Sequence, residues 1–372
     1  MRVVIEVPDD KSGTGTYVRE LIASLGRLPI AETGEKIEVI PACYKRLPKE
    51  RYGQSLSRFL NSFRMVWWAQ VALPRMCKRE RADVLHCPAF VCPLWVPCPV
   101  VLMVFDLTHE RYPETMDALW RNYLRLFFKP SIRKASRIVT TSDFSAREIE
   151  QYYPVTRGKV TVTYMGASAV YGPERDPGST KRALERYGVT QPYFLYVGSL
   201  NPRKNIPGLV AGFEEFKRKS GLPHRLVLAG GKGWRLGDLE KALAPHVASG
   251  DAVVTGYVEP MPAFYHGAEA LLMPSLYEGF GLPIVEAMAC GCPVITSNCS
   301  SMPEVAGDAG LLADPNQPHE IAAAMRRVAT DAQFRRAMVE RGFRQAVQFS
   351  FDRMGAQTAQ VYRELLAAKR NR

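Results

Sequence analysis

Two glutamates stand out in this 372-residue chain because their spacing fits a ligand site. Glu278 and Glu286 lie eight positions apart, on either side of a turn with two glycines that joins a predicted strand (270–273) to a predicted helix opening near Leu282. The free N–H groups and the positive dipole end of such a helix suit a diphosphate. Carboxylates that flank this turn suit sugar hydroxyls, so the segment indicates a ligand that carries both groups.

A second candidate is the pair of cations Arg203 and Lys204, which follow another predicted strand (193–197) and its Gly198. Ligands of open α/β sheets bind at the carboxyl ends of the strands. Two positive charges there could neutralise a diphosphate leaving group as charge develops in a transition state. An Arg-Lys pair in a loop is by itself a weak signal, since most such pairs are solvated surface charges.

A third candidate is the turn after the first predicted strand (3–7), which contains Gly13 and Gly15. A Gly-x-Gly turn lets a ligand approach the backbone closely. The turn lacks the third glycine of a dinucleotide fingerprint, and the chain has no Gly-Lys-Ser/Thr of a P-loop. It is therefore weak evidence for NAD or ATP.

The net charge is 49 − 37 = +12, and residues 44–81 carry two thirds of it, with ten Lys/Arg and two Glu. Aromatic residues recur at helical spacing among these bases: Phe59, Phe63, Trp67 and Trp68. One interpretation is a basic amphipathic surface for a membrane or an acceptor phosphate. The other is an aromatic stripe that faces the core and leaves a solvated basic back.

The composition narrows the class of protein. Hydrophobic residues make up 47% and charged residues 23%, which excludes disordered and collagen-like chains. The positive charge favours an anionic partner, namely a phosphate ligand, a lipid surface or nucleic acid. Because the excess sits in one segment and no RNA- or DNA-binding motif occurs, we expect no nucleic acid partner.

Eight cysteines are present, without a Cys-x-x-Cys pair, and no two histidines stand at zinc spacing. We expect buried, reduced thiols and no metal site. The N-terminus enters a strand without a signal-peptide pattern, and the longest apolar stretch (91–105) contains three prolines and is too short to span a membrane. These features predict a cytoplasmic protein.

Strands that alternate with helices predict an α/β fold with parallel, doubly wound sheets. The pattern runs to about residue 162 and restarts at 193, with a Gly- and Pro-rich linker at 171–180. We therefore predict a first domain at 1–172 and a second at 173–350. A terminal helix (351–372) is expected to pack back on the first domain.

At this point the residues resemble a known family. Segment 274–297 is similar to the Glu-x7-Glu signature of family 4 retaining glycosyltransferases, and 298–314 continues it. Residues 197–205 resemble the phosphate loop of that family, and 104–114 and 141–148 resemble its N-terminal half. The resemblance covers nearly the whole chain. It implies a GT-B fold, in which two Rossmann-like domains face each other across a cleft and the second binds a nucleotide-sugar.

The resemblance also implies roles for residues of the donor site. Glu286 is expected to hold the ribose hydroxyls and Glu278 the hydroxyls of the donor sugar, while Arg203 and Lys204 grip the diphosphate. The remaining donor-binding residues are expected to be Gly13, Gly15, Gly198, Tyr257, Val258, Gly279, Phe280, Gly281 and Leu282.

The first domain departs from the family pattern at one position. Many relatives have a His directly before an Asp at the end of a strand, and here Phe105 stands before Asp106. His109 follows three residues later. Asp106 and His109 are both candidates for the reacting centre, and they join Glu278 and the two cations as the predicted catalytic residues.

The activity that the resemblance implies is transfer of a hexose with retention of the anomeric configuration, so that an α-linked donor gives an α-linked product. The chain has no Asp-x-Asp, which favours metal-independent transfer. Segment 278–315 resembles bacterial mannosyltransferases of surface-polysaccharide assembly, which favours GDP-mannose over UDP-hexoses as donor. The expected acceptor is a saccharide linked to polyprenyl diphosphate.

The same resemblance gives segment 44–81 a role. Its bases would hold the acceptor diphosphate and contact an anionic membrane peripherally, at the inner face of the cell membrane. Two other functions stay open from the residues alone: a nucleotide-sugar epimerase with a related fold, and a basic nucleic-acid-binding protein.

Overall fold

The computed structural model describes residues 1–8, 13–28, 36–44, 54–231 and 237–370. The chain forms two compact units. The first consists of Met1–Met165 together with Phe351–Arg372, and the second of Gly166–Ser350. The division after Met165 lies a few residues before the predicted boundary at 172. Each unit contains a six-stranded parallel sheet, as the alternation of strands and helices predicted.

The first sheet has the strand order β2-β1-β3-β4-β5-β6. Its strands are β1 (Arg2–Val7), β2 (Glu38–Cys43), β3 (Val84–Cys87), β4 (Val100–Met103), β5 (Arg137–Thr140) and β6 (Val160–Val162). Val3, Val4 and Ile5 of β1 are completely buried. Apolar residues follow one another there because helices cover both faces of a parallel sheet.

The helices of the first unit are α1 (Gly13–Arg27), α4 (Gln54–Trp67), α5 (Leu73–Arg79), α6 (Thr108–Arg111), α7 (Ala118–Lys134), α8 (Asp143–Tyr152) and α17 (Phe351–Arg370). Shorter turns are the π-helix η1 (Trp68–Ala72) and the 3₁₀-helices η2 (Pro113–Thr115) and η3 (Pro154–Thr156). Side-chain caps fix two of the starts: Asp117 accepts from the Leu119 amide of α7, and Ser142 from the Ser145 amide of α8.

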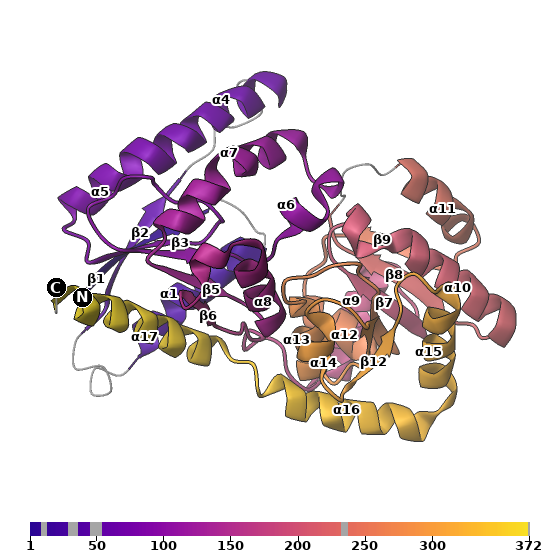
Figure 1. Ribbon diagram of the computed structural model, residues 1–372. Helices are drawn as coiled ribbons and strands as arrows, with labels where there is room; N and C mark the ends of the chain where they lie inside the picture. Colours follow the sequence, from indigo (N-terminus) through magenta and orange to yellow (C-terminus); the bar gives the residue numbers. More distant parts are fainter. Residues whose placement is uncertain (9–12, 29–35, 45–53, 232–236, 371–372) are drawn as a thin grey trace. The chain divides into compact units, whose positions relative to one another are not determined.

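The terminal helix α17 packs against α1, which Figure 1 shows as two adjacent helices of the first unit. Arg27 at the end of α1 pairs with Asp352, with Nε 3.0 Å from Oδ1. Deeper in the unit, the buried His86 of β3 contacts two tyrosine hydroxyls: Tyr17 of α1 at 3.2 Å and Tyr362 of α17 at 2.8 Å. Polar contacts therefore join α17 to α1 at the surface and to β3 in the core.

The second sheet has the strand order β12-β11-β10-β7-β8-β9. Its strands are β7 (Tyr193–Val197), β8 (Arg225–Ala229), β9 (Ala252–Gly256), β10 (Ala270–Met273), β11 (Val294–Ser297) and β12 (Gly310–Ala313). The edge strand β12 was not predicted. It is short and half-exposed, and its sequence, Gly-Leu-Leu-Ala, contains no β-branched residue.

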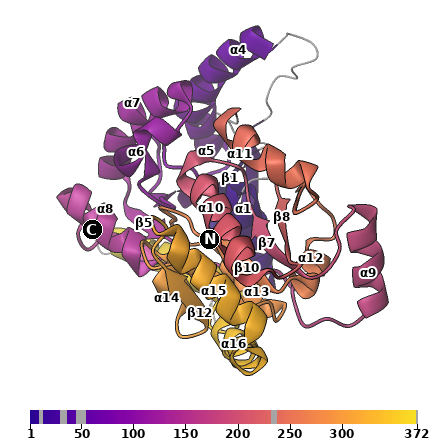
Figure 2. The ribbon, with the colours of Figure 1, turned by 90° about the vertical axis from the view of Figure 1, so that its right-hand side faces the viewer.

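The helices of the second unit are α9 (Pro177–Arg186), η4 (Pro202–Lys204), α10 (Ile206–Ser220), α11 (Gly237–Ala248), α12 (Met261–Gly267), α13 (Leu282–Ala289), α14 (Met302–Ala306), α15 (Pro318–Thr330) and α16 (Ala332–Ala346). Figure 2 shows α10 and α15 packed side by side. Helix α9 occupies part of the predicted linker, because Asp176 caps it by accepting from the Ser179 amide at 3.1 Å.

Both sheets share a topological feature that matters for ligands. The chain adds strands on one side of the first strand of each unit and then crosses to its other side, between β1 and β3 in the first unit and between β7 and β10 in the second. A crevice forms outside the carboxyl ends of the strands at such a switch point, and ligands of doubly wound sheets bind there.

Three predictions about the surface of the chain can be compared with the structure. All eight cysteines are free thiols, and six are buried, but Cys43 is exposed and Cys299 half-buried, so the expectation of buried thiols was wrong for Cys43. The aromatic stripe divides, since Phe63 and Trp67 are exposed while Trp68 turns inward; the side chain of Phe59 lies outside the described part. None of the described helices has the length and apolarity needed to cross a membrane.

Candidate active site

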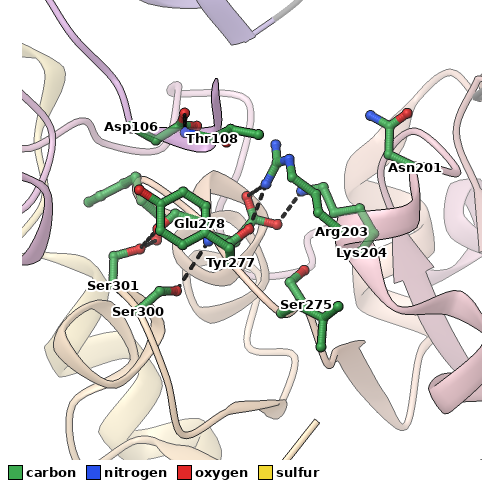
Figure 3. Close-up of polar contacts among 12 residues, drawn as sticks. Asp106, Thr108, Asn201, Arg203, Lys204, Ser275, Tyr277, Glu278, Ser300 and Ser301 are labelled. Atoms are coloured by element: carbon green, nitrogen blue, oxygen red, sulfur yellow. Dashed lines mark hydrogen bonds and ion pairs between the residues drawn. The ribbon is translucent and has the colours of Figure 1, made fainter. Parts of the chain in front are cut away.

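The predicted cations and the first glutamate meet at the switch point of the second unit. Arg203 and Lys204 lie in η4 after β7, and Glu278 lies in the loop after β10. Arg203 Nη1 is 2.8 Å from Glu278 Oε2, and Lys204 Nζ contacts Oε1 of the same carboxylate. Figure 3 shows both cations directed at this carboxylate. Positions about 75 residues apart thus form one charged cluster.

The electrostatics of this cluster follow from its burial. Glu278 is 5% exposed and Lys204 8% exposed. Burial alone would raise the pKa of Glu278, but the charges and hydrogen bonds of Arg203 and Lys204 outweigh it and hold the pKa at about 2. The carboxylate is therefore ionised at neutral pH. The three side chains carry a net charge of +1, which leaves the cluster attractive to an anion.

Hydrogen bonds to the backbone hold the loop of Arg203 against the loop that contains Glu278. Arg203 Nη1 also donates to the Tyr277 carbonyl at 2.7 Å, and the Leu276 amide donates to the Arg203 carbonyl at 2.8 Å. Asn205 ends η4 in the left-handed region (φ +54°) and anchors the start of α10 by donating from Nδ2 to the Pro315 carbonyl at 2.6 Å. The cations are thus fixed by their own main chain and by the loop they face.

A serine-rich loop at the end of β11 supports the other side of Glu278. The sequence analysis included it in the segments that resemble the family signature but did not name its serines. The Glu278 amide donates to Ser300 Oγ at 3.1 Å. Ser301 Oγ lies 2.9 Å from the Glu278 carbonyl and 3.1 Å from that of Phe280, to which it donates. Ser297 Oγ donates to the Ser275 carbonyl at 2.7 Å. The three serines at 297, 300 and 301 were the available signal, because short hydroxyl side chains readily bond to nearby main chain.

The predicted anion-binding turn is present at the start of α13. Gly281 is the residue before the helix and has φ +94°, which an L side chain rarely adopts. A Cβ there would also lie 3.0 Å from Ile284 and 3.2 Å from Met273. Leu282 and Pro283 begin the helix, so its first free N–H groups follow Gly281 directly. Gly279 and Phe280, just before the turn, are buried.

Glu286 lies on the same helix and has two tyrosine partners that the sequence did not indicate. Tyr265 of α12 donates its hydroxyl to Glu286 Oε2 at 2.9 Å, and Tyr171 also hydrogen-bonds to this carboxylate. The two tyrosine rings meet edge to face, with centroids 5.9 Å apart. Burial raises the pKa of Glu286, while both hydrogen bonds act to lower it. Tyr171 lies in the segment that the sequence marked as a linker.

Three further predicted donor residues follow the strands of the second unit. Gly198 follows β7 and has φ +142°. A Cβ on Gly230, which follows β8, would lie only 2.0 Å from the Gly198 carbonyl oxygen. The loops after β7 and β8 therefore approach each other closely. Tyr257 and Val258 follow β9; Tyr257 is 63% exposed and Val258 is buried. All three lie at the carboxyl edge of this sheet.

The remaining predicted residues belong to the first unit. Asp106 follows β4, and its Oδ1 accepts from the Thr108 amide at 2.9 Å. The His109 ring packs edge-on against Phe128, with centroids 4.2 Å apart, and burial lowers its pKa. Gly13 begins α1 and is exposed, whereas Gly15 is buried. The roles of these four residues stay predictions. Among the described residues, no group of three or more His, Cys, Asp or Glu could hold a metal ion.

Two six-stranded parallel sheets with flanking helices, each with a switch point, define the GT-B class of α/β proteins, as predicted. The fold is similar to that of sucrose-phosphate synthase from Thermosynechococcus elongatus, with a TM-score of 0.76 and 20% identity over 99% of this chain and all of that one. It is also similar to HepE from Anabaena in complex with UDP and glucose, with a TM-score of 0.73 and 18% identity over 98% and 100% of the two chains.

Sequence comparison gives the family. Residues 180–345 match the family described as glycosyl transferases group 1, and residues 11–169 match glycosyltransferase family 4. The chain therefore belongs to these glycosyltransferases. A curated relative, O-antigen chain mannosyltransferase B of Escherichia coli, is 37% identical over 246 residues. That alignment covers 65% of this chain and 64% of the relative, so the chain matches somewhat less than two thirds of it.

Proposed function

We propose that this protein is an enzyme that transfers a hexose from a nucleotide-sugar to a saccharide acceptor. The observation that carries the proposal is the cluster of Arg203, Lys204 and Glu278 at the switch point, next to the start of α13. A diphosphate needs cations and N–H groups, and the second unit offers both at one edge of its sheet. Membership of the glycosyltransferase family supports the same activity.

Arg203 and Lys204 act on the leaving group in this proposal. When the bond between sugar and phosphate breaks, negative charge grows on the diphosphate, and fixed cations stabilise it without rearranging. Glu278 keeps both cations in place before the donor binds. Its carboxylate then exchanges part of its ion pairing for hydroxyls of the donor sugar.

Glu286 binds the ribose of the donor. Its carboxylate accepts from Tyr265 and Tyr171, and four lone-pair positions leave room for hydroxyl donors as well. The tyrosines orient the carboxylate, and the exposed Tyr257 lies at the same edge of the sheet, as a residue that borders the base would.

The donor that we favour is GDP-mannose. The acceptor that we favour is a saccharide linked to polyprenyl diphosphate, to which the mannose is joined in an α linkage. The 37% identity to an O-antigen chain mannosyltransferase supports mannose and a polysaccharide acceptor. The second candidate is a UDP-hexose, because a protein with the same fold was solved with UDP and glucose.

We further propose retention of the anomeric configuration without a metal ion. The carboxylate–cation cluster supplies charges that suit a diphosphate leaving group. Proton NMR of the product tests this, since an α-linked product from an α-linked donor, formed equally well in EDTA, is expected. A β-linked product, or loss of activity in EDTA, would contradict this part of the proposal.

The donor site is tested by nucleotide-sugar binding. Titration with GDP-mannose, UDP-glucose and UDP-N-acetylglucosamine is expected to show tightest binding of GDP-mannose. Glu286→Ala is expected to weaken that binding about tenfold or more, because it removes charged hydrogen bonds to the ribose. Glu340→Ala, at an exposed position of α16, is the matched control and should change nothing. Equal affinity of the Glu286 variant and the wild type would place the ribose elsewhere.

A further inference from the structure

Glu6 is an acid at a position where the fold favours an apolar side chain. Alternate residues of a strand point to the same face, so Glu6 shares the face of Val4. Val4 belongs to the core that also contains Leu73 and Phe128. Since β1 lies between β2 and β3, Glu6 is on an internal strand. A carboxyl group there is costly unless it is paired, and such groups often mark functional sites.

The partner of Glu6 comes from an unusual piece of helix. Trp68 Nε1 donates to Glu6 Oε1 at 3.0 Å. Trp68 begins η1, a five-residue π-helix between α4 and α5, and π-helical turns occur frequently at functional sites. Gln70 in the same turn donates to the Cys92 carbonyl at 3.3 Å and accepts from the Leu94 amide at 3.0 Å. The turn that holds Glu6 is therefore itself fixed.

Glu6 also lies at the place in the first unit where a ligand is expected. Ile5 pairs with His86 across β1 and β3, so Glu6 and Cys87 stand at the carboxyl ends of the two strands that flank the switch point. In the second unit, the corresponding edge carries the cluster around Glu278. Unlike Glu278, Glu6 is only partly buried. Within the described parts of the chain, its hydrogen bond goes to Oε1, which leaves Oε2 for a ligand.

The chemistry of a carboxyl group selects the kind of ligand. It repels a phosphate and accepts a hydrogen bond from a hydroxyl, so it suits the sugar part of an acceptor and not its diphosphate. We propose that Glu6 is an acceptor-binding residue, whose carboxylate accepts a hydrogen bond from a hydroxyl of the acceptor saccharide while Trp68 orients it. This inference rests on the proposed function as a glycosyltransferase.

The ionisation of this carboxyl provides a specific readout. Burial raises the pKa of Glu6 to about 7, against the opposing effect of the Trp68 hydrogen bond. The titratable groups around it are Tyr123 of α7, Cys87 of β3 and Cys92, and burial raises the pKa of each, so they stay neutral near pH 7. Because the carboxylate is the better acceptor, saccharide binding should weaken as the pH falls from 8 to 6.

The experiment uses the full chain and titrates it with octyl glycosides of mannose, glucose, galactose, rhamnose and N-acetylglucosamine, followed by saturation-transfer NMR at pH 6, 7 and 8. Glu6→Gln should weaken binding of the best glycoside about tenfold at pH 8 and remove the pH dependence. Trp68→Phe should move the midpoint to higher pH, because the lost hydrogen bond had lowered the pKa. Glu38→Gln, at an exposed carboxylate near the amino end of β2, should behave like wild type.

GDP-mannose binding separates the two proposals, because the donor cluster around Glu278 lies in the second unit and Glu6 is not among the predicted donor-binding residues. If the Glu6 variant binds glycosides as tightly as wild type, or if wild type binds none of them while it still binds the nucleotide-sugar, the role of Glu6 is overturned. If wild type binds no nucleotide-sugar, the proposed function fails instead. Should Glu6→Gln not fold, an unchanged midpoint in Trp68→Phe would overturn the inference by itself.

Discussion

At the scale of single residues, the carboxylate of Glu278 stabilises two largely buried cations before any ligand binds. Arg203 and Lys204 would repel each other and lose hydration there, and the carboxylate offsets both costs. The same arrangement leaves a surplus positive charge for a diphosphate. In the proposed function, ground-state pairing and ligand binding use the same three side chains.

Lys204→Ala tests the proposed role in the transition state. Removal of one preorganised charge is expected to cost about 2–4 kcal/mol of transition-state stabilisation. The measurement is kcat/KM for transfer from GDP-mannose, compared with Lys181→Ala, which removes an exposed lysine of α9. Wild-type turnover of the Lys204 variant would show that the cation does not act on the leaving group.

Glu278→Gln tests the ion pairing through pH. The folded pKa of about 2 lies below the ordinary value of 4.5, so the ionised group stabilises the fold above pH 4.5, and this contribution is lost as the pH falls toward 2. The difference is on the order of 3 kcal/mol. Urea unfolding at pH 7, 5 and 3 should show a larger free energy of unfolding for wild type than for the variant at pH 7. The difference between the two should be smaller at pH 3. A difference that does not depend on pH would contradict the pairing.

At the scale of elements, the helices of segment 44–81 decide which of its aromatic side chains are exposed and which face inward. Trp67 and Trp68 do not face the same way, because adjacent residues of a helix point about 100° apart. The Trp68 side chain points inward and donates to Glu6. Phe63 and Trp67 stay exposed, at 63% and 57%. Trp68 therefore agrees with the interpretation of an aromatic stripe that faces the core, whereas a membrane or phosphate surface at Phe63 and Trp67 stays a prediction. Exposed aromatics next to exposed bases suit the interface of an anionic membrane.

Replacement of Arg75, Lys78, Arg79 and Arg81 by serine tests peripheral membrane contact. All four side chains are exposed. Each base near an anionic surface contributes about 1 kcal/mol, so the variant should partition far less onto vesicles that contain anionic lipid. Flotation of the protein with such vesicles measures this.

The matched control removes four exposed arginines of the second unit, replaced by serine: Arg218, Arg326, Arg336 and Arg344. It lowers the net charge by the same amount, so a purely non-specific attraction would weaken equally in both variants. Unchanged partitioning of the first variant would leave α5 as ordinary scaffold.

At the scale of the whole molecule, the chain builds its first unit from both of its ends. Residues 351–370 pass from the second unit back to the first, where Tyr362 bonds to His86 and Arg27 to Asp352. The buried His86 is neutral, since burial lowers its pKa to about 3. The last helix is thus part of the core that holds the first sheet.

Tyr362→Phe tests this anchoring. Loss of a buried hydrogen bond should destabilise the first unit by about 1–3 kcal/mol and speed hydrogen exchange in α1 and α17. GDP-mannose affinity should change little, because most of the proposed donor residues lie in the second unit. The control is Tyr152→Phe, which changes an exposed tyrosine at the end of α8. Unchanged exchange in α17 would contradict the anchoring role.

Much of the fold could be predicted because its signals are local. The buried strands β1, β7, β10 and β11 are short apolar runs bounded by Gly, Pro or Ser, and such runs need no partner to be recognised. The edge strand β12 was missed although Gly-Leu-Leu-Ala is also a short apolar run, because it is half-exposed and becomes a strand by pairing with β11. The segment of Tyr171 was predicted to be a linker because it is rich in glycine and proline. Nothing in its sequence indicates that Tyr171 hydrogen-bonds to Glu286.

The sequence by itself determined the types of residue in the candidate site, since a glycine-bounded helix start, two cations and two carboxylates can be identified from neighbouring positions. Only the tertiary structure decided their partners. Glu278 meets Arg203 and Lys204 because the crossover places the ends of β7 and β10 side by side. Glu6 became a candidate for the same reason. A strand order is set by the packing of the whole sheet, and no local pattern contains it.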